Sequence, residues 1–158
     1  MKQRVYIDTS VIGGCFDEEF EIWSNQFFDE VRKGHFTVLI SDITYRELEL
    51  APQVVQDFVL TLPKESIESL TSSPEVDGLA ARYIEAGAIS SRFSEDARHI
   101  AIATIKKSDI LISWNFKHIV NLEKIRKYNA VNMMHGYSVL EIRTPREILK
   151  ESKNENKE

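Results

Sequence analysis

Short apolar runs alternate along the chain with longer segments in which apolar residues recur every three or four positions. The short runs predict strands at 3–8, 36–41, 65–70, 109–114 and 137–142, although 65–70 also fits an extended connector. The longer segments predict helices at 17–34, 42–50, 52–62, 74–87, 95–107, 119–128 and 144–149. Alternating strands and helices, with two strands apolar throughout, are typical of a parallel sheet that helices cover on both faces.

The chain is expected to form one domain. Its 158 residues match the usual size of a domain, and 42% hydrophobic residues are enough for a normal core. No repeat, linker or low-complexity segment precedes residue 150. We therefore expect a single domain over residues 1–150, followed at 151–158 by a charged tail that is disordered.

Several classes of protein are disfavoured by the composition. No apolar run reaches the ~20 residues of a membrane span, and the N-terminus lacks the apolar stretch of a signal peptide. We therefore expect a cytoplasmic protein with no membrane contact. The single cysteine, Cys15, excludes an internal disulfide and a cysteine zinc cluster. The net charge of -5 does not favour nucleic-acid binding, unless several acids bind metal ions that offset their charge.

Four polar residues stand where predicted strands end or where the following helices begin. Asp8 closes the first strand, and Asn115 follows the strand "DILISW". Glu47 lies about one turn into the helix after the second strand, and Asp96 lies in the first turn of a later helix. Ligands of parallel sheets bind outside the carboxyl ends of the strands, so we expect these four side chains to converge. Their hard oxygen atoms suit Mg²⁺ or Mn²⁺.

Each of the four also has an ordinary structural explanation. Asp8 begins an Asp-Thr-Ser run that suits a helix N-cap. Glu47 follows Thr44 by three residues, which matches a capping box. Asp96 complements a helix dipole, and Asn115 is a common turn residue. The pattern alone leaves both explanations open for each residue.

Taken together, the motifs resemble the PIN-domain ribonucleases, in particular the VapC-like toxins of bacterial type II toxin–antitoxin pairs. The resemblance covers nearly the whole chain and rests, in order, on "VYIDTSVIGG", "SDITYREL", "EDARHIAIAT", "DILISWNFKHI" and "MMHGYSVLEIRTPREIL". It implies a three-layer α/β/α sandwich with a mostly parallel central sheet. It also implies a metal-dependent endoribonuclease that cleaves single-stranded RNA and is the toxin of such a pair. Its expected partners are RNA, an antitoxin and a second copy of the chain.

The resemblance assigns the acids in order. Asp8, Glu47 and Asp96 match the first, second and third acids of the family pattern, and we expect them to bind Mg²⁺ or Mn²⁺. Asn115 falls where many members carry a fourth acid. This departure removes one negative charge, although an amide oxygen can still bind a metal ion or a metal-bound water. It weakens the case for a strict two-metal mechanism.

The expected mechanism is hydrolysis by in-line attack of water on a phosphate. Asp8 and Asp96 would hold an ion directly or through water, and Glu47 would bind it or orient the attacking water. His99 lies three residues after Asp96 and is expected in an outer shell or at the surface.

Five further residues are expected to bind substrate. The hydroxyls of Thr9 and Ser10 would either orient Asp8 or contact a phosphate. Arg46, Lys117 and His118 lie beside the proposed ligands in sequence and would steer the RNA backbone.

Two other classes of function compete with the nuclease. One is a non-catalytic binding module, whose acidic cleft receives a basic peptide from a partner. The other is a phosphotransfer or receiver domain with Asp8 as the phosphoacceptor. Such domains usually pair acids after the first strand and carry a late lysine, and the sequence shows neither clearly. The aromatic helix with Trp23, Phe27 and Phe28 is either core or a surface for an antitoxin or a second copy.

Overall fold

A computed structural model describes residues 2–155, and for residues 151–155 it describes the backbone only. Within these residues five strands form one sheet: β1 (Gln3–Ile7), β2 (Phe36–Ser41), β3 (Ile67–Leu70), β4 (Ile110–Ile112) and β5 (Ile142–Arg143). Their order is β3-β2-β1-β4-β5, and all four pairings are parallel. The predicted α/β sandwich is therefore confirmed, and the carboxyl ends of all strands share one edge.

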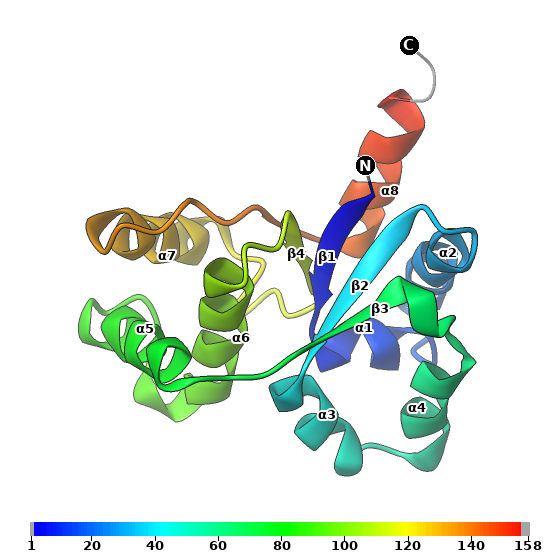
Figure 1. The fold of residues 1–158 in the computed structure, drawn as a ribbon, viewed down its shortest axis with the longest axis horizontal. Helices are drawn as coiled ribbons and strands as arrows, with labels where there is room; N and C mark the ends of the chain where they lie inside the picture. The colour runs from blue at the N-terminus through cyan, green and yellow to red at the C-terminus, as the bar shows by residue number, and fades with distance from the viewer. Residues whose placement is uncertain (1, 156–158) are drawn as a thin grey trace.

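Eight α-helices surround the sheet in the described part of the chain. They are α1 (Thr9–Gly14), α2 (Glu21–Arg32), α3 (Asp42–Glu49), α4 (Gln53–Phe58), α5 (Pro74–Glu85), α6 (Ser94–Ile105), α7 (Leu122–Met134) and α8 (Pro145–Glu155). Figure 1 shows α5, α6 and α7 on one side of the sheet and α2, α4 and α8 on the other. Helices α1 and α3 follow directly from the carboxyl ends of β1 and β2.

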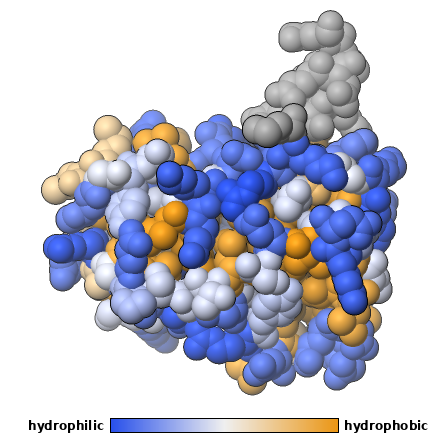
Figure 2. Space-filling model, in the orientation of Figure 1, coloured by the Kyte–Doolittle hydropathy of each residue, from blue (hydrophilic) through white to orange (hydrophobic). Residues whose placement is uncertain are grey.

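Strand periodicity divides the core into two hydrophobic clusters, one on each face of the sheet. Tyr6 points into the cluster beneath α5, α6 and α7, whereas its neighbours Val5 and Ile7 point into the cluster beneath α1, α2 and α8. Phe27 and Phe28 of α2 are fully buried in the second cluster, so that part of the aromatic helix is core. On the face shown in Figure 2, apolar side chains are gathered in small areas between polar ones.

The structure differs from the predicted elements mainly at their ends. A short helix, α1, follows β1 where none was predicted, and turns at residues 15–20 delay the next helix to Glu21. Strand β5 has two residues, because it pairs with β4 only at Leu111↔Ile142 and Ile112↔Arg143. Helix α7 begins and ends later than predicted.

The last helix, α8, extends further along the chain than the sequence predicted. Thr144 and Glu147 form a capping box at the start of α8, because the backbone N–H of each donates to the other's side chain, over 3.1 and 3.2 Å. Helix α8 runs to Glu155, into the segment expected to be a disordered tail. The rest of that expectation concerns residues 156–158, which lie outside those described. No helix among the described residues is long and apolar enough to cross a membrane.

Candidate active site

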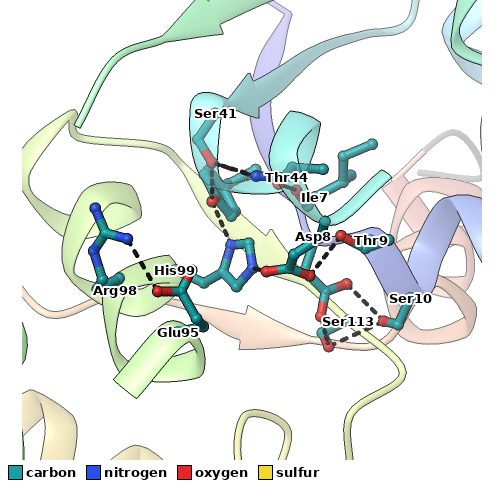
Figure 3. A network of polar contacts seen from close by, with 12 residues as sticks. Ile7, Asp8, Thr9, Ser10, Ser41, Thr44, Glu95, Arg98, His99 and Ser113 are labelled. Carbon is teal, nitrogen blue, oxygen red and sulfur yellow. Dashed lines mark hydrogen bonds and ion pairs between the residues drawn. The ribbon is translucent and has the colours of Figure 1, made fainter. Parts of the chain in front are cut away.

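Asp8 lies where β1 meets α1, at the carboxyl edge of the sheet. The residue is 5% exposed, and its carboxylate accepts hydrogen bonds from two hydroxyls (Figure 3). Ser10 donates to Oδ1 over 2.6 Å, and Ser113, just after β4, donates to Oδ2 over 2.7 Å. Asp8 occupies the N-cap position of α1, but its side chain makes no capping hydrogen bond. Asp8 is therefore the N-cap residue of α1 by position, as the Asp-Thr-Ser run suggested, but its carboxylate does not cap the helix.

The burial of Asp8 has an electrostatic consequence. Removal from water raises the pKa of the carboxyl above its usual value, because burial disfavours the charged form. The positive charge of His99 and the two serine hydroxyls act in the opposite direction, and nearby Glu47 raises the pKa further. A buried carboxylate at a strand end with a raised pKa is typical of a functional site.

Glu47 points from α3 toward the same edge. Its Oε2 accepts a hydrogen bond from the Thr9 hydroxyl over 2.7 Å, and its Oε1 lies 2.5 Å from His99 Nε2. The helix is capped instead by Ser41, which accepts from the backbone N–H of Thr44. The capping-box explanation of Glu47 is therefore wrong. Burial alone raises the pKa of Glu47, but the contacts with His99 and Thr9 outweigh it and leave the pKa lowered.

His99 is buried in α6 and joins Glu47 to a line of hydroxyls. Its Nδ1 lies 2.6 Å from Tyr6 Oη, which lies 2.7 Å from Ser41 Oγ. The pKa of His99 is raised well above its usual value: burial lowers it, but Tyr6 and the carboxylates of Glu47 and Asp8 outweigh that effect. A doubly protonated ring donates to Glu47 and to Tyr6, and Tyr6 in turn donates to Ser41. His99 is 1% exposed, so the expectation that it lies at the surface is wrong, whereas its outer-shell role stays a prediction.

Asp96 and Asn115 form the other side of the site. Asp96 lies in the first turn of α6, and its pKa is raised by burial and by the charge of Glu47. His99, His118 and a hydrogen bond from Asn115 lower the pKa, but they do not outweigh burial. The Asn115 oxygen also accepts the backbone N–H of His118 over 3.0 Å, as in a turn. Asp96 and Asp8 each interact electrostatically with His99 and Glu47. The structure thus gathers the four predicted residues around one edge of the sheet.

The residues expected to bind substrate divide into three groups. The hydroxyls of Thr9 and Ser10 are hydrogen-bonded to the carboxylates of Glu47 and Asp8. Arg46 and Lys117 are exposed. His118 is only 8% exposed and stacks on Phe93 with ring centroids 3.8 Å apart, and its buried Nδ1 has no hydrogen-bond partner among the described residues. Burial lowers the pKa of His118, so its ring is mostly neutral near pH 7.

Ser113, Ser41 and Tyr6 are the residues of the site that the sequence did not reveal. Ser41 ends β2 and Ser113 follows β4, each after an apolar run, as Asp8 follows β1. Alternation in strands places the three side chains on the face that α6 covers. A serine at the end of a buried strand is the sequence feature that could have identified Ser41 and Ser113 as residues of the site.

The carboxylates of the site do not by themselves form a complete set of metal ligands. Among the described residues, no group of three or more His, Cys, Asp and Glu side chains is arranged to hold one. Both Glu47 oxygens accept hydrogen bonds from within the chain, as both Asp8 oxygens do, but one donor to Glu47 is the positively charged His99, which disfavours a cation at this carboxylate. Asp8 and Asp96 remain, with the Asn115 amide beside them. Mg²⁺ commonly takes only one or two protein carboxylates and keeps several waters, so this oxygen set suits it.

Comparison with known proteins relates the chain to others through its fold. The sequence matches no protein-family model and no curated protein. The structure is similar to a chain of VapBC2 from Rickettsia felis, solved bound to a DNA fragment from its promoter, with a TM-score of 0.57 and 12% identity over 90% of this chain and 98% of that one. It is also similar to tyrosyl-tRNA synthetase from Aeropyrum pernix, with a TM-score of 0.50 and 11% identity over 90% of this chain and 52% of that one. The chain therefore has a PIN-like α/β fold.

Proposed function

We propose that this protein is a metal-dependent endoribonuclease that cleaves single-stranded RNA and acts as the toxin of a toxin–antitoxin pair. One observation carries the proposal: Asp8 and Asp96, 88 positions apart in the sequence, lie beside Glu47 and His99 with raised pKa values, Asp8 buried and Asp96 half-buried. Removing one carboxylate from water fully and a second in part costs stability, and functional sites are the usual place for such an arrangement. The likeness to a VapBC2 chain over nearly its full length supports the same reading.

The residues that would hold Mg²⁺ or Mn²⁺ are Asp8 and Asp96, with Asn115 beside them. When bound, such an ion supplies positive charge against the phosphoryl oxygens and lowers the pKa of water. Ser10 and Ser113 fix the Asp8 carboxylate through one hydrogen bond to each oxygen. Asn115 holds Asp96. Each oxygen of Asp8 retains a free lone pair for a further contact.

Glu47 has a different role in this proposal. The contacts with His99 and Thr9 lower its pKa, so it is a weak proton acceptor near pH 7. The same contacts fix its orientation. We assign to Glu47 the positioning of the attacking water through its remaining lone pairs. Arg46 and Lys117, exposed near the site, would attract the RNA backbone.

The partners belong to the same proposal. VapBC2 is a complex of two proteins, and by analogy this chain would bind an antitoxin and a second copy of itself in the cytoplasm. A basic antitoxin segment would be attracted by the net charge of -5 and by the carboxylates at the sheet edge.

The test is cleavage of a long single-stranded RNA by purified protein with Mn²⁺, and with EDTA as the metal-free control. Asp8→Asn and Asp96→Asn should each lower the rate by at least 100-fold, on the order expected when a metal site or a charge stabiliser is lost. Glu95→Gln is the matched control for Asp96. Glu95 is its exposed neighbour in the first turn of α6 and pairs with Arg98 over 3.1 Å.

The melting temperature gives a second readout of the metal site. Mn²⁺ should stabilise the wild type and the Glu95→Gln variant, and should stabilise Asp8→Asn and Asp96→Asn much less. Full cleavage by Asp8→Asn would exclude the proposed mechanism. RNA that stays intact under all conditions, while a basic peptide still binds, would favour the non-catalytic module instead.

A further inference from the structure

An aromatic cavity of about 560 Å³ lies between the start of α2, the start of α8 and the loop after β4. Four of its lining residues are aromatic: Phe20, Trp23, Trp114 and Phe116. Phe20 stacks on Trp114 with centroids 4.4 Å apart, and Phe116 lies tilted at 6.2 Å from Phe20. Phe116 is 50% exposed, so part of this aromatic surface faces solvent. Such rings offer flat faces on which a planar ligand can stack.

The cavity is joined directly to the candidate active site. Residues 113–116 alternate in direction after β4: Ser113 and Asn115 contact the site carboxylates, while Trp114 and Phe116 line the cavity. The backbone N–H of Trp114 donates to Ser10 Oγ over 2.9 Å, and Ser10 donates to Asp8. One hydroxyl therefore connects the cavity wall to the carboxylate.

Cationic side chains accompany the aromatic rings. The Arg146 guanidinium carbon lies 5.1 Å from the Trp23 ring centroid, and Lys150 also lines the cavity. Two acids, Glu19 and Glu147, line it as well, but Glu147 is engaged in capping α8. Aromatic faces with adjacent cations are the combination with which proteins bind the bases and phosphates of single-stranded nucleic acid.

We propose that this cavity holds one unpaired base of an RNA strand, next to the nucleotide whose phosphate lies at Asp8 and Asp96. The inference rests on the proposed nuclease function and names its substrate class: a single strand with at least one base free to leave the stack. The base packs against Phe116 and the outer side of the Phe20–Trp114 stack, and Arg146 and Lys150 face the adjoining phosphates. Duplex RNA is excluded, because a paired base cannot enter the cavity.

The two tryptophans of the chain both line the cavity, so intrinsic tryptophan fluorescence reports on it alone. The experiment titrates the Asp8→Asn protein, in EDTA so that the RNA stays intact, with a single-stranded oligoribonucleotide of about ten nucleotides. We expect saturable quenching, and none with the same sequence as a duplex. Phe116→Ala, in the same background, should weaken binding on the order of tenfold, the usual effect of losing one stacking ring.

Phe16→Ala is the matched control. Phe16 is 45% exposed, packs edge-on against Phe58 with centroids 5.9 Å apart, and does not line the cavity. Absence of quenching, or equal affinities for the Phe116→Ala and Phe16→Ala variants, overturns the base site. The cleavage assay on the wild type keeps the two proposals apart. Quenching without cleavage leaves the base site and removes the nuclease, whereas cleavage without quenching removes the base site only.

Discussion

His99 Nε2 lies 2.5 Å from Glu47 Oε1, and this contact ties α6 on one face of the sheet to α3 at its carboxyl edge. The other ring nitrogen contacts Tyr6 from β1. Three elements far apart in sequence therefore fix one carboxylate. Because Glu47 is held this way, its position depends on groups that contact neither substrate nor metal, and these groups can be removed one at a time.

Tyr6→Phe should lower both stability and activity. The change keeps the buried ring but leaves His99 Nδ1 and Ser41 without the hydroxyl, and a buried polar group that loses its partner costs about 1–3 kcal/mol. We expect the free energy of unfolding in urea to fall by that amount, and kcat for RNA cleavage to fall as Glu47 loses its fixed position.

Tyr83→Phe is the control for this prediction. Tyr83 is equally buried, and its hydroxyl contacts Asn132 over 2.5 Å, away from the site. The control should lose similar stability and keep its kcat. Equal kcat values for the two variants would show that the line from Tyr6 to Glu47 serves stability alone.

Asp8→Asn should stabilise the metal-free protein at neutral pH. The folded chain binds a proton at Asp8 more tightly than the unfolded chain, because burial raises the pKa. Ionised Asp8 therefore destabilises the fold at pH 7.5, and an isosteric neutral side chain removes that penalty. As the pH falls through the raised pKa toward 3.8, wild-type Asp8 takes up its proton and the advantage of the variant shrinks. Melting temperatures in EDTA at pH 7.5 and pH 5 measure both effects, and a variant less stable than wild type at pH 7.5 would contradict the assignment.

The sequence predicted much of the fold because its strongest patterns are local. Strands β2 and β4 are buried on both faces, so each is apolar throughout and stands out as a short run. Strand β5 pairs over two residues at an edge, and its true extent depends on β4 rather than on its own side chains. The acids of the site were predictable because the carboxyl ends of parallel strands meet.

The contacts that hold these acids were not predictable in the same way. Tyr6 and His99 are 93 positions apart, and Asp8 and Ser113 are 105 positions apart. The pairing of hydroxyls with carboxylates depends on the register of the sheet and on how α6 packs against it. No local sequence pattern encodes either of these. For the same reason Glu47 matched a capping box in sequence, whereas Ser41 caps the helix in the structure.

Gly14→Ala should disturb the loop that carries Trp114 and Asn115. A Cβ at residue 14 would lie 2.6 Å from Ser24 Oγ and 2.7 Å from Trp114 Nε1, two atoms that are hydrogen-bonded to each other over 2.8 Å. Overpacking of this kind typically costs about 1–3 kcal/mol. Gly13→Ala is the matched control in the same helix, where nothing lies within 4 Å, and it should be neutral or stabilising by up to ~1 kcal/mol. Thermal unfolding and tryptophan emission would show the difference, and equal effects of the two substitutions would contradict it.

Cys15 should make the fold lose stability at alkaline pH. The thiol is buried beside the Val11 carbonyl, and burial raises its pKa from 9.0 to about 12. Below pH 9 the thiol is protonated in both states and has no pH-dependent effect. Between pH 9 and 12 it ionises in the unfolded chain first, so the fold loses up to about 1.4 kcal/mol per pH unit. The Cys15→Ala variant has no thiol and therefore lacks this pH dependence. Ionisable groups that both proteins share cancel when the two free energies of unfolding are subtracted. Urea unfolding from pH 8 to 10.5 should therefore show the wild type losing its advantage over the variant, whereas parallel curves would mean that the thiol already ionises freely in the folded state.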